Sequence, residues 1–268
     1  MNLQNKNILL TGASGGIGQA LALALAEKGA RLWLVGRDAV ALNTLCARLP
    51  HSEHHSVVVV NHYSDEDIED LTRLFWGNTR LDVLINNAGT NRFALLEEQS
   101  FSDIREQIRV NVELPLLLTR GLCHQFNAGG IILNIGSILG EIGHPGYSIY
   151  SATKAALHRF SEALGRELSL SGLSVLYVAP RATRTRFNTE AANALNASLG
   201  NGSDTAEYVA QKIILSLEKE HKRQRLGFVE KLFVKINALL PSIVDRALSK
   251  KMSVIDRYAR QHAGRSVK

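Results

Sequence analysis

The sequence predicts an α/β fold: a doubly wound parallel sheet in three α/β/α layers, forming a single domain. Short apolar runs rich in Val, Ile and Leu recur along the chain, and amphipathic stretches of helical length separate them. Such continuous runs are typical of parallel strands covered on both faces. A length of 268 residues, 45% of them hydrophobic, suits one domain with a large core. The predicted strands are 7–10, 32–35, 57–60, 83–85, 131–135 and 175–178.

A glycine-rich turn, Thr11 to Gly18, directly follows the first predicted strand and opens a helical stretch from Gln19 to Lys28. Glycine lets the backbone approach a phosphate closely. The free N–H groups and the dipole of a helix amino terminus favour its negative charge. A glycine turn alone is weak evidence, but its place between strand and helix strengthens it. The candidate phosphate-binding residues are Gly12, Ser14, Gly15, Gly16, Ile17 and Gly18.

Tyr150 and Lys154 carry the strongest chemical signal. If residues 147–170 form a helix, a spacing of four places the phenol and the ammonium on one face. A phenol has an ordinary pKa of about 10, and a neighbouring cation lowers it toward the working range. With Ser137 thirteen residues upstream to hold a carbonyl oxygen, the set suits carbonyl–alcohol chemistry. Taken alone, such a Tyr/Lys pair is more often a surface pair on a helix.

Four motifs in order make the chain resemble the compact short-chain dehydrogenase/reductase family, from about Lys6 to Leu217. They are the loop Thr11-Gly12-x-x-x-Gly16-x-Gly18, the turn Asn86-Asn87-Ala88-Gly89, the serine at 137, and the pair Tyr150/Lys154. The resemblance implies a Rossmann-like fold. The loop also fits the Thr-Gly-x-x-Gly-x-x-Gly pattern of a longer, epimerase-like branch, but the chain length and the Asn-Asn-Ala-Gly turn favour the compact branch.

The resemblance also implies a role for each residue of a catalytic tetrad. Tyr150 would be the acid for reduction and the base for oxidation, and Ser137 would hold the substrate oxygen. Lys154 would contact the nicotinamide ribose and lower the pKa of the phenol. Asn111 would position a water for proton relay; the plainer interpretation is a helix-interior asparagine bonded to nearby backbone. The expected activity is an oxidoreductase that interconverts a carbonyl and an alcohol.

The residues at the carboxyl ends of the strands predict the coenzyme. Gly36 occupies the position where an acidic side chain would select NAD(H), and Arg37 follows it with a guanidinium suited to a 2′-phosphate. NADP(H) is therefore expected, with NAD(H) as the alternative; Arg37 could instead merely start the next helix. The resemblance places three further groups around the coenzyme: Asn61 at the adenine, Asn87, Ala88 and Gly89 at the adenosine side, and Pro180, Thr183 and Thr185 at the nicotinamide. Arg181 stands where the family has glycine.

The carboxy-terminal region has a different character from the rest. Up to Ala210 there are 17 basic and 20 acidic residues, a net charge of −3; from Gln211 on there are 14 and 5, a net charge of +9. We expect residues 1–220 to form the dinucleotide-binding and catalytic domain, with a substrate lid at about 186–204, and residues 221–268 to form a basic amphipathic helical extension. The extension either lies on an anionic membrane surface or packs on the protein or a sister subunit.

Several other classes of function are not expected. The basic end lacks aromatic stacking residues and a DNA-binding motif, so no nucleic-acid partner is expected. His51, His54, His55 and His62 lack convincing metal-ligand spacing, so no metal site is expected. Two cysteines suggest no disulfide framework, and neither a signal peptide nor a membrane span is expected. The location should be cytoplasmic, or peripheral at the inner membrane face.

Apolar residues in the lid and between Ser137 and Tyr150 suggest a small or lipid-like apolar carbonyl or alcohol substrate. Ordinary core packing explains the same residues equally well. Family habit implies a homodimer or homotetramer through the helices at 101–126 and 147–170. The alternative function, from another class, is a catalytically idle dinucleotide sensor or scaffold that acts through its basic tail.

Overall fold

Seven parallel strands form one sheet in the computed structural model, which describes residues 1–77 and 79–263. Their order, β3-β2-β1-β4-β5-β6-β9, reverses direction between β1 and β4, as the doubly wound prediction requires. Two further strands, β7 (Thr183–Arg184) and β8 (Asp204–Thr205), pair in parallel as a separate two-stranded sheet. The strands of the main sheet are β1 (Asn7–Thr11), β2 (Arg31–Gly36), β3 (Ser56–Val59), β4 (Leu81–Asn86), β5 (Phe126–Ile135), β6 (Ser174–Ala179) and β9 (Arg223–Arg225).

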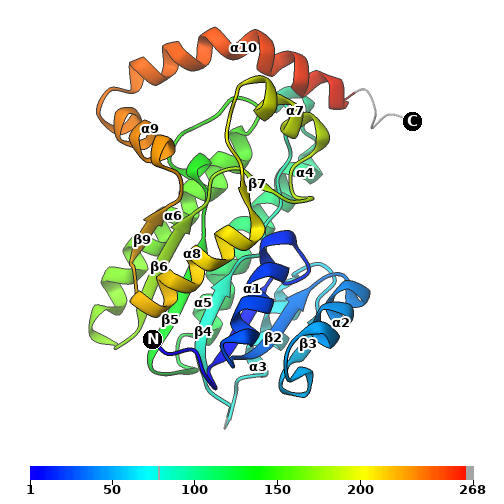
Figure 1. Cartoon of the computed structure of the whole chain (residues 1–268), viewed down its shortest axis with the longest axis vertical. Helices are drawn as coiled ribbons and strands as arrows, with labels where there is room; N and C mark the ends of the chain where they lie inside the picture. Colours follow the sequence, from blue (N-terminus) through cyan, green and yellow to red (C-terminus); the bar gives the residue numbers. More distant parts are fainter. Residues whose placement is uncertain (78, 264–268) are drawn as a thin grey trace.

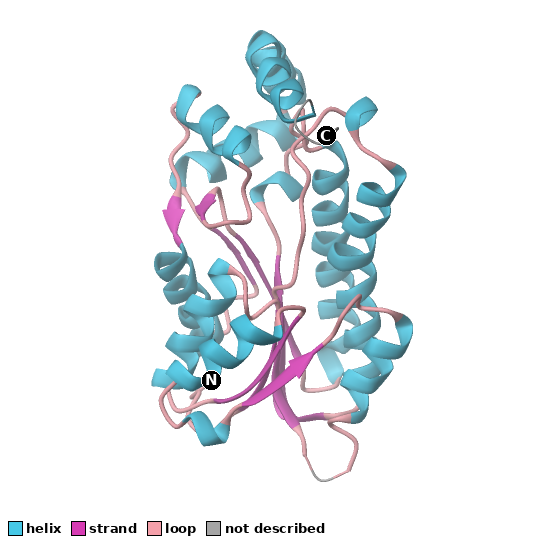
Figure 2. Ribbon diagram, turned by 90° about the vertical axis from the view of Figure 1, so that its right-hand side faces the viewer, coloured by secondary structure: helices cyan, strands magenta, loops and turns pink. Residues whose placement is uncertain are grey.

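Helices cover both faces of the sheet, which gives the three expected layers (Figures 1 and 2). One layer contains α1 (Gly16–Glu27), α2 (Ala39–Arg48) and α8 (Ala206–Lys219), and the other contains α3 (Asp65–Arg73), α4 (Phe101–Ile108), α5 (Leu114–Leu122) and α6 (Ser148–Glu167). The first strand shows why. Ile8 and Leu10 pack into the first layer, whereas Leu9 packs into the second, because successive side chains of a strand point to opposite faces. The predicted fold class is confirmed.

The last strand of the sheet was missed by the sequence analysis. β9 lies inside the predicted helical extension, and it pairs in parallel with β6 through Arg223, Gln224 and Arg225. Three polar residues at a sheet edge carry no apolar run, so their sequence does not predict a strand. The helical part of the extension therefore begins only after Leu226.

Three helices lie above the carboxyl ends of the strands (Figure 1): α7 (Glu190–Ser198), α9 (Phe228–Leu239) and α10 (Pro241–Ala263). α10 packs on both α7 and α9. Ile255 and Ala259 of α10 are fully buried in one apolar cluster with Tyr147 and Tyr150. For α10 the structure thus agrees with packing on the protein's own body. Among residues 1–77 and 79–263, no helix combines the length and apolarity needed to cross a bilayer.

Candidate active site

The glycine turn forms one wall of a cleft of about 1380 Å³ at the carboxyl ends of the strands. Gly12 has a φ of +65°, and a Cβ there would lie 2.7 Å from the Cα of Ala88. A Cβ on Gly18 would clash with the carbonyl oxygen of Gly12, and one on Gly16 would clash with the side chain of Thr185. The backbone is therefore packed at three places where only glycine fits.

The turn that contains Asn87 and Ala88 is bound directly to the glycine turn. The Thr11 hydroxyl accepts hydrogen bonds from the backbone N–H groups of Asn87 and Ala88, both at 3.0 Å. The Asn87 side-chain amide donates to the carbonyl oxygens of Thr11 at 3.0 Å and Gly12 at 3.1 Å. Asn87 and Ala88 thus line the cleft mainly by holding its backbone in place.

The amino terminus of α1 fits the diphosphate group of a dinucleotide. Gly15 is the N-cap, no side chain caps the helix, and its first turn has no acidic residue. The first N–H groups of a helix have no partner within it, and they attract an anion together with the helix dipole. Ser14, Gly15, Gly16 and Ile17 all line the cleft here. This uncapped helix end is a suitable anion cradle for the predicted coenzyme.

Arg37 lines the same cleft directly after β2, as predicted. Its guanidinium forms an ion pair with Glu106 at 3.0 Å, and both side chains are about half exposed. Asp38, not Arg37, caps α2, because its carboxylate accepts from the backbone N–H of Ala41 at 2.9 Å. At Gly36 a Cβ would lie 3.1 Å from the Ser14 hydroxyl and 3.5 Å from the Leu42 side chain, so a larger side chain there would crowd the glycine turn.

Tyr150, Lys154 and Ser137 lie together in this cleft. Tyr150 and Lys154 share the buried face of α6, and the Lys154 ammonium nitrogen is 5.9 Å from the centre of the Tyr150 ring. The ammonium donates to the backbone carbonyl oxygen of Ile135 at 2.9 Å. Ser137 follows β5, lies within hydrogen-bonding reach of Tyr150, and accepts from the Leu139 N–H at 3.1 Å. The phenol, the ammonium and the serine hydroxyl thus come together as the spacing predicts.

The acidity of the pair differs from the expectation. Burial raises the pKa of Tyr150 to about 12, and the hydrogen bond from Ser137 lowers it only in part. Burial also lowers the pKa of Lys154 to about 8. Lys154 is not among the groups that shift the phenol pKa in this arrangement, in which the ammonium lies 5.9 Å from the ring centre and donates to a carbonyl. Its role in lowering the phenol pKa stays a prediction. The phenol is protonated at neutral pH, as a proton donor must be.

Asn111 lies behind the cleft, in a π-helical turn at Arg109–Glu113, and is 1% exposed. Its side-chain oxygen accepts from the Thr90 N–H at 2.9 Å. Its amide donates to the Thr90 carbonyl at 2.8 Å and to the Thr153 hydroxyl at 3.0 Å. The side chain thus holds the loop after Gly89 against α6.

Asn61 does not lie where the sequence predicts, whereas Arg181 fits its position at the edge of the cleft. Asn61 is exposed and is not among the lining residues, whereas the buried Tyr63 lines the cleft beside Arg37. Arg181 adopts an ordinary backbone conformation, so it tolerates the glycine position. Arg181 lines the cleft, and its guanidinium contacts Asp204 at 2.7 Å and Glu230 at 3.3 Å, so it also joins these two segments. Pro180, Thr183 and Thr185 line the cleft as predicted.

The carboxy-terminal helices also line the cleft, which the sequence analysis missed. α9 contributes Val229, Glu230 and Phe233, and α10 contributes Val244, Ala247, Leu248 and Lys251. Their amphipathic spacing predicts helices, but it contains no signal for where those helices dock.

Comparison with known proteins assigns the family. The sequence model described as short chain dehydrogenase matches residues 6–196. The chain belongs to the short-chain dehydrogenase family. It is 34% identical to the 3-oxoacyl-[acyl-carrier-protein] reductase FabG of Vibrio cholerae over 67% of this chain and 74% of that protein. It is 28% identical to the uncharacterized oxidoreductase YxnA of Bacillus subtilis over 98% of this chain and 75% of that protein, a match that takes in α9 and most of α10.

Solved structures of this family share the fold. A short-chain dehydrogenase from Streptomyces avermitilis is 30% identical, with a TM-score of 0.76 over 94% of this chain and 97% of that one. One from Sphingobium yanoikuyae, in complex with NADPH, is 28% identical, with a TM-score of 0.75 over 90% of this chain and 96% of that one. The similarity thus extends over the whole α/β domain of this oxidoreductase family.

Proposed function

We propose that the chain is an NADP(H)-dependent oxidoreductase that interconverts a carbonyl and an alcohol on a small or lipid-like apolar substrate. The supporting observation is that Tyr150, Lys154 and Ser137 line the same cleft as the uncapped amino terminus of α1. A nicotinamide coenzyme bound there would supply or accept the hydride. The likeness to a family member in complex with NADPH supports the coenzyme.

The residues of the chain supply the proton and hold the substrate. The Tyr150 phenol, protonated at neutral pH, would donate its proton to the carbonyl oxygen during reduction. Ser137 would donate a hydrogen bond to the same oxygen and stabilise its developing charge. Lys154 would contribute positive charge beside the phenol, and Asn111 would hold the loop after Gly89 in place.

The lid at about 186–204 is part of this proposal. The Phe187 ring centre lies 6.0 Å from the Tyr150 ring centre. Ala192 and Leu195 of α7 belong to the same apolar cluster as Tyr150. Closure of this segment over a bound substrate would exclude water from the phenol.

Turnover of NADPH with a panel of aldehydes and ketones tests the activity. Tyr150→Phe should lower kcat by about 10²–10⁴-fold because it removes the proton donor, while the Kd for NADPH stays unchanged. Tyr208→Phe, at an exposed position on α8, is the matched control. Tight NADPH binding without turnover of any carbonyl would instead favour the idle sensor or scaffold.

Arg37 and Glu106 test the coenzyme preference. Arg37→Ala should weaken NADPH binding about 10- to 100-fold, the value of a charge-assisted contact, and leave NADH binding nearly unchanged. Glu106→Gln should tighten NADPH binding, because the 2′-phosphate no longer has to compete with the Glu106 carboxylate for the Arg37 guanidinium. Equal loss of both coenzymes in Arg37→Ala would contradict the preference.

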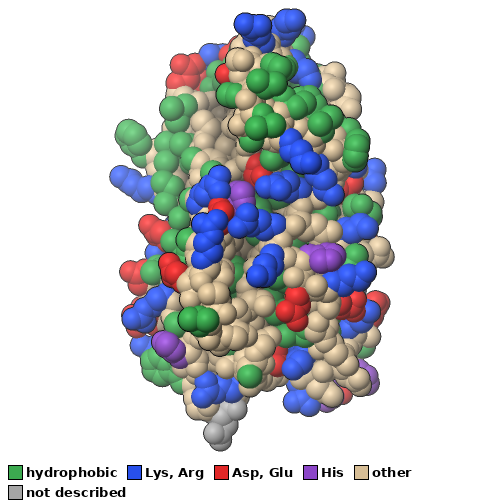
Figure 3. Space-filling view, turned by 90° about the vertical axis from the view of Figure 1, so that its left-hand side faces the viewer, with side chains coloured by type: hydrophobic (Ala, Val, Ile, Leu, Met, Phe, Trp, Pro, Cys, Tyr) green, Lys and Arg blue, Asp and Glu red, His purple; other side chains and the backbone are tan. Residues whose placement is uncertain are grey.

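Two surfaces support the remaining partner proposals. We propose a homo-oligomer through α4, α5 and α6, since Phe101 is 80% exposed and Leu117 is 41% exposed; light scattering of Phe101→Asp should show a smaller particle. We also propose contact of the outer face of α9 with anionic membranes. There Phe228 and Leu239 are exposed on the same helix as Lys231 and Lys235. In the upper part of Figure 3, hydrophobic side chains gather with Lys and Arg both above and below them.

Co-sedimentation with vesicles that contain anionic lipid tests the membrane contact. Binding at low salt that weakens at physiological salt is expected. No co-sedimentation at either salt concentration would rule the contact out.

A further inference from the structure

The cleft continues past Tyr150 into a space bounded by the two carboxy-terminal helices. The side chains that α9 and α10 contribute are apolar except for Glu230 and Lys251. Glu230 is paired with Arg181. Lys251 is exposed; burial lowers the pKa of His144, which lines the same cleft, and the charge of Lys251 lowers it further. The surface facing this space is therefore mostly apolar, and it is continuous with the site of the phenol.

α9 is held in place from both sides of the site. Glu230 binds Arg181, which follows β6, and the Asn237 amide donates to the Glu141 carbonyl at 3.2 Å, in the segment after β5. Residues 230 and 237 are two helical turns apart, so they share one face, and Phe233 lies between them on that face. The stretch of helix that carries Phe233 is therefore held to both loops that border Tyr150 and Ser137.

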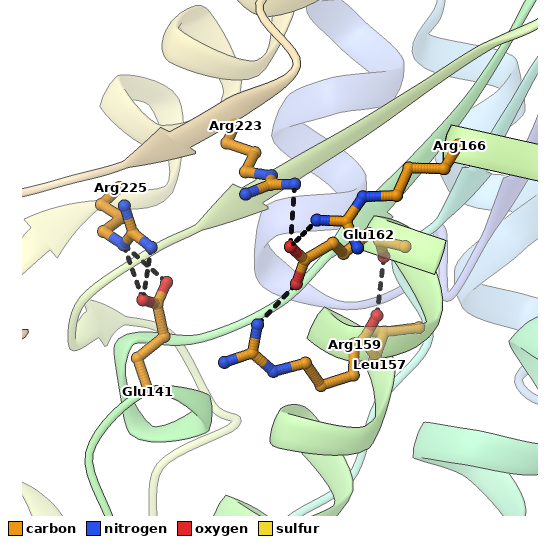
Figure 4. A network of polar contacts seen from close by, with 8 residues as sticks. Glu141, Leu157, Arg159, Glu162, Arg166, Arg223 and Arg225 are labelled. Carbon is orange, nitrogen blue, oxygen red and sulfur yellow. Dashed lines mark hydrogen bonds and ion pairs between the residues drawn. The ribbon is translucent and has the colours of Figure 1, made fainter. Parts of the chain in front are cut away.

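A second ion pair strengthens this attachment. The Arg225 guanidinium, at the end of β9, binds both carboxylate oxygens of Glu141 at 2.7 Å (Figure 4). The Glu141 side chain is only 5% exposed. Paired guanidinium and carboxylate groups of this kind are strong and directional. α9 is thus a fixed wall of the site rather than a loose appendage.

Phe233 remains 43% exposed although it lines this cleft, and Val229 is 57% exposed. Covering such apolar surface is favourable in water. We propose that the wall formed by Val229, Phe233, Val244 and Leu248 is a subsite for an extended hydrocarbon chain, attached to the carbonyl that reaches Tyr150. This inference rests on the proposed function and assigns its substrate class: ketones or aldehydes with a long aliphatic chain.

α9 itself provides the matched control. Phe228 is 84% exposed on the same helix but does not line the cleft. If the wall is a substrate subsite, replacing Phe233 should change the reduction of long-chain substrates, and replacing Phe228 should not. A membrane surface or a second copy of the chain covering the outer face of α9 would depend on Phe228 instead.

The test measures kcat/KM with NADPH for unbranched 2-alkanones of increasing length. In the wild type, kcat/KM should rise about threefold to fourfold for each methylene that the wall buries. Phe233→Ala should lower kcat/KM about tenfold or more for the longest ketones, through KM, and leave 2-butanone unchanged. Phe233→Leu should restore most of the loss, and Phe228→Ala should match the wild type. Long-chain primary amides, which are not reduced here, should show the same pattern in Kd by calorimetry.

Three outcomes would overturn the subsite: kcat/KM independent of chain length, equal loss for short and long ketones in Phe233→Ala, or equal effects of Phe228→Ala and Phe233→Ala. These outcomes differ from failure of the proposed function, in which no carbonyl of any length is reduced. Length-independent turnover would thus reject the subsite and leave the oxidoreductase intact.

Discussion

On the coenzyme side of the cleft the wall is made of backbone, whereas on the substrate side it is made of side chains from distant segments. Gly12 and Gly18 pack without any Cβ, and the turn at Asn87 is hydrogen-bonded to them. On the other side, Arg181 joins Asp204 and Glu230, which lie 23 and 49 residues further along the chain. The coenzyme side is held in place because Gly12 and Gly18 have no Cβ and can pack closely. The substrate side is held in place by ion pairs.

This difference determines which substitutions each side of the cleft tolerates. At Gly12 and Gly18 the coenzyme side cannot accept an added methyl group, because the nearest atoms it would meet belong to the main chain. A side-chain wall accepts changes in size but depends on the pairing of its charges. Substitutions on the two sides should therefore differ in both size and kind of effect.

The largest effect is expected from Gly18→Ala. The new Cβ would clash with the Gly12 carbonyl, so the turn has to shift. We expect a loss of about 1–3 kcal/mol in unfolding free energy and about 10- to 100-fold weaker NADPH binding, measured by denaturation and titration. Gly165→Ala is the matched control. It lies inside α6 with its nearest contact at 3.5 Å, and the higher helix propensity of alanine should stabilise it by up to about 1 kcal/mol. Destabilisation of similar size in both variants would contradict the argument.

The same contrast explains what could be predicted from the sequence. The fold, the glycine turn and the Ser137, Tyr150 and Lys154 set are encoded in short segments whose spacing is set by strands and helices. The acidity of Tyr150 was not predictable, because burial depends on the full tertiary structure. Nor was the place of α9, which depends on ion pairs between distant residues such as Arg181 and Glu230. β9 was missed because its three residues are polar.

The second effect is expected from Arg181→Met, on the substrate side. It leaves the Asp204 carboxylate, 8% exposed, without its cation. Removing one partner of a fully buried pair costs about 3–5 kcal/mol, but Arg181 is 27% exposed, so we expect about 1–3 kcal/mol in unfolding free energy. NADPH affinity should change less than in Gly18→Ala. The double variant with Asp204→Asn should recover part of the loss; strictly additive losses would show that the pair is not coupled.

The third effect is a pH dependence. Burial lowers the pKa of Lys154 from its ordinary value to about 8, so the ammonium loses its proton as the pH rises through that value. Tyr150, at about 12, stays protonated throughout this range. Because the positive charge of Lys154 beside the phenol is lost above about pH 8, the kcat/KM for carbonyl reduction should be constant below that pH and fall above it. The kcat/KM for alcohol oxidation, which needs the phenolate, should instead rise toward alkaline pH. The residual activity of Lys154→Met should lack the fall near pH 8. The same fall in that variant would assign it to another group.

The smallest effect is expected where a carboxylate is paired with arginines that are themselves exposed to water. Figure 4 shows Glu162 of α6 surrounded by Arg159 and Arg166 of the same helix and by Arg223 of β9. The hydrogen bond from Arg159 lowers the pKa of Glu162 the most, with help from the other two arginines. The Glu162 side chain is 13% exposed, but the three arginines are 47–75% exposed and can turn to water when Glu162 is replaced. The Tm of Glu162→Gln should therefore fall by less than that of Arg181→Met.

The sign of this last effect follows from the lowered pKa. A carboxylate whose pKa is lower in the folded than in the unfolded chain stabilises the fold above its unfolded pKa, and this contribution is lost as the pH falls through the folded value. The difference in Tm between wild type and Glu162→Gln should therefore be present at neutral pH and vanish in acid. Glu167→Gln, on the same helix and without an ion pair among the described residues, should show no such pH dependence. A larger effect from Glu162 than from Arg181 would mean that surface charge, rather than the buried pair, holds the substrate side together.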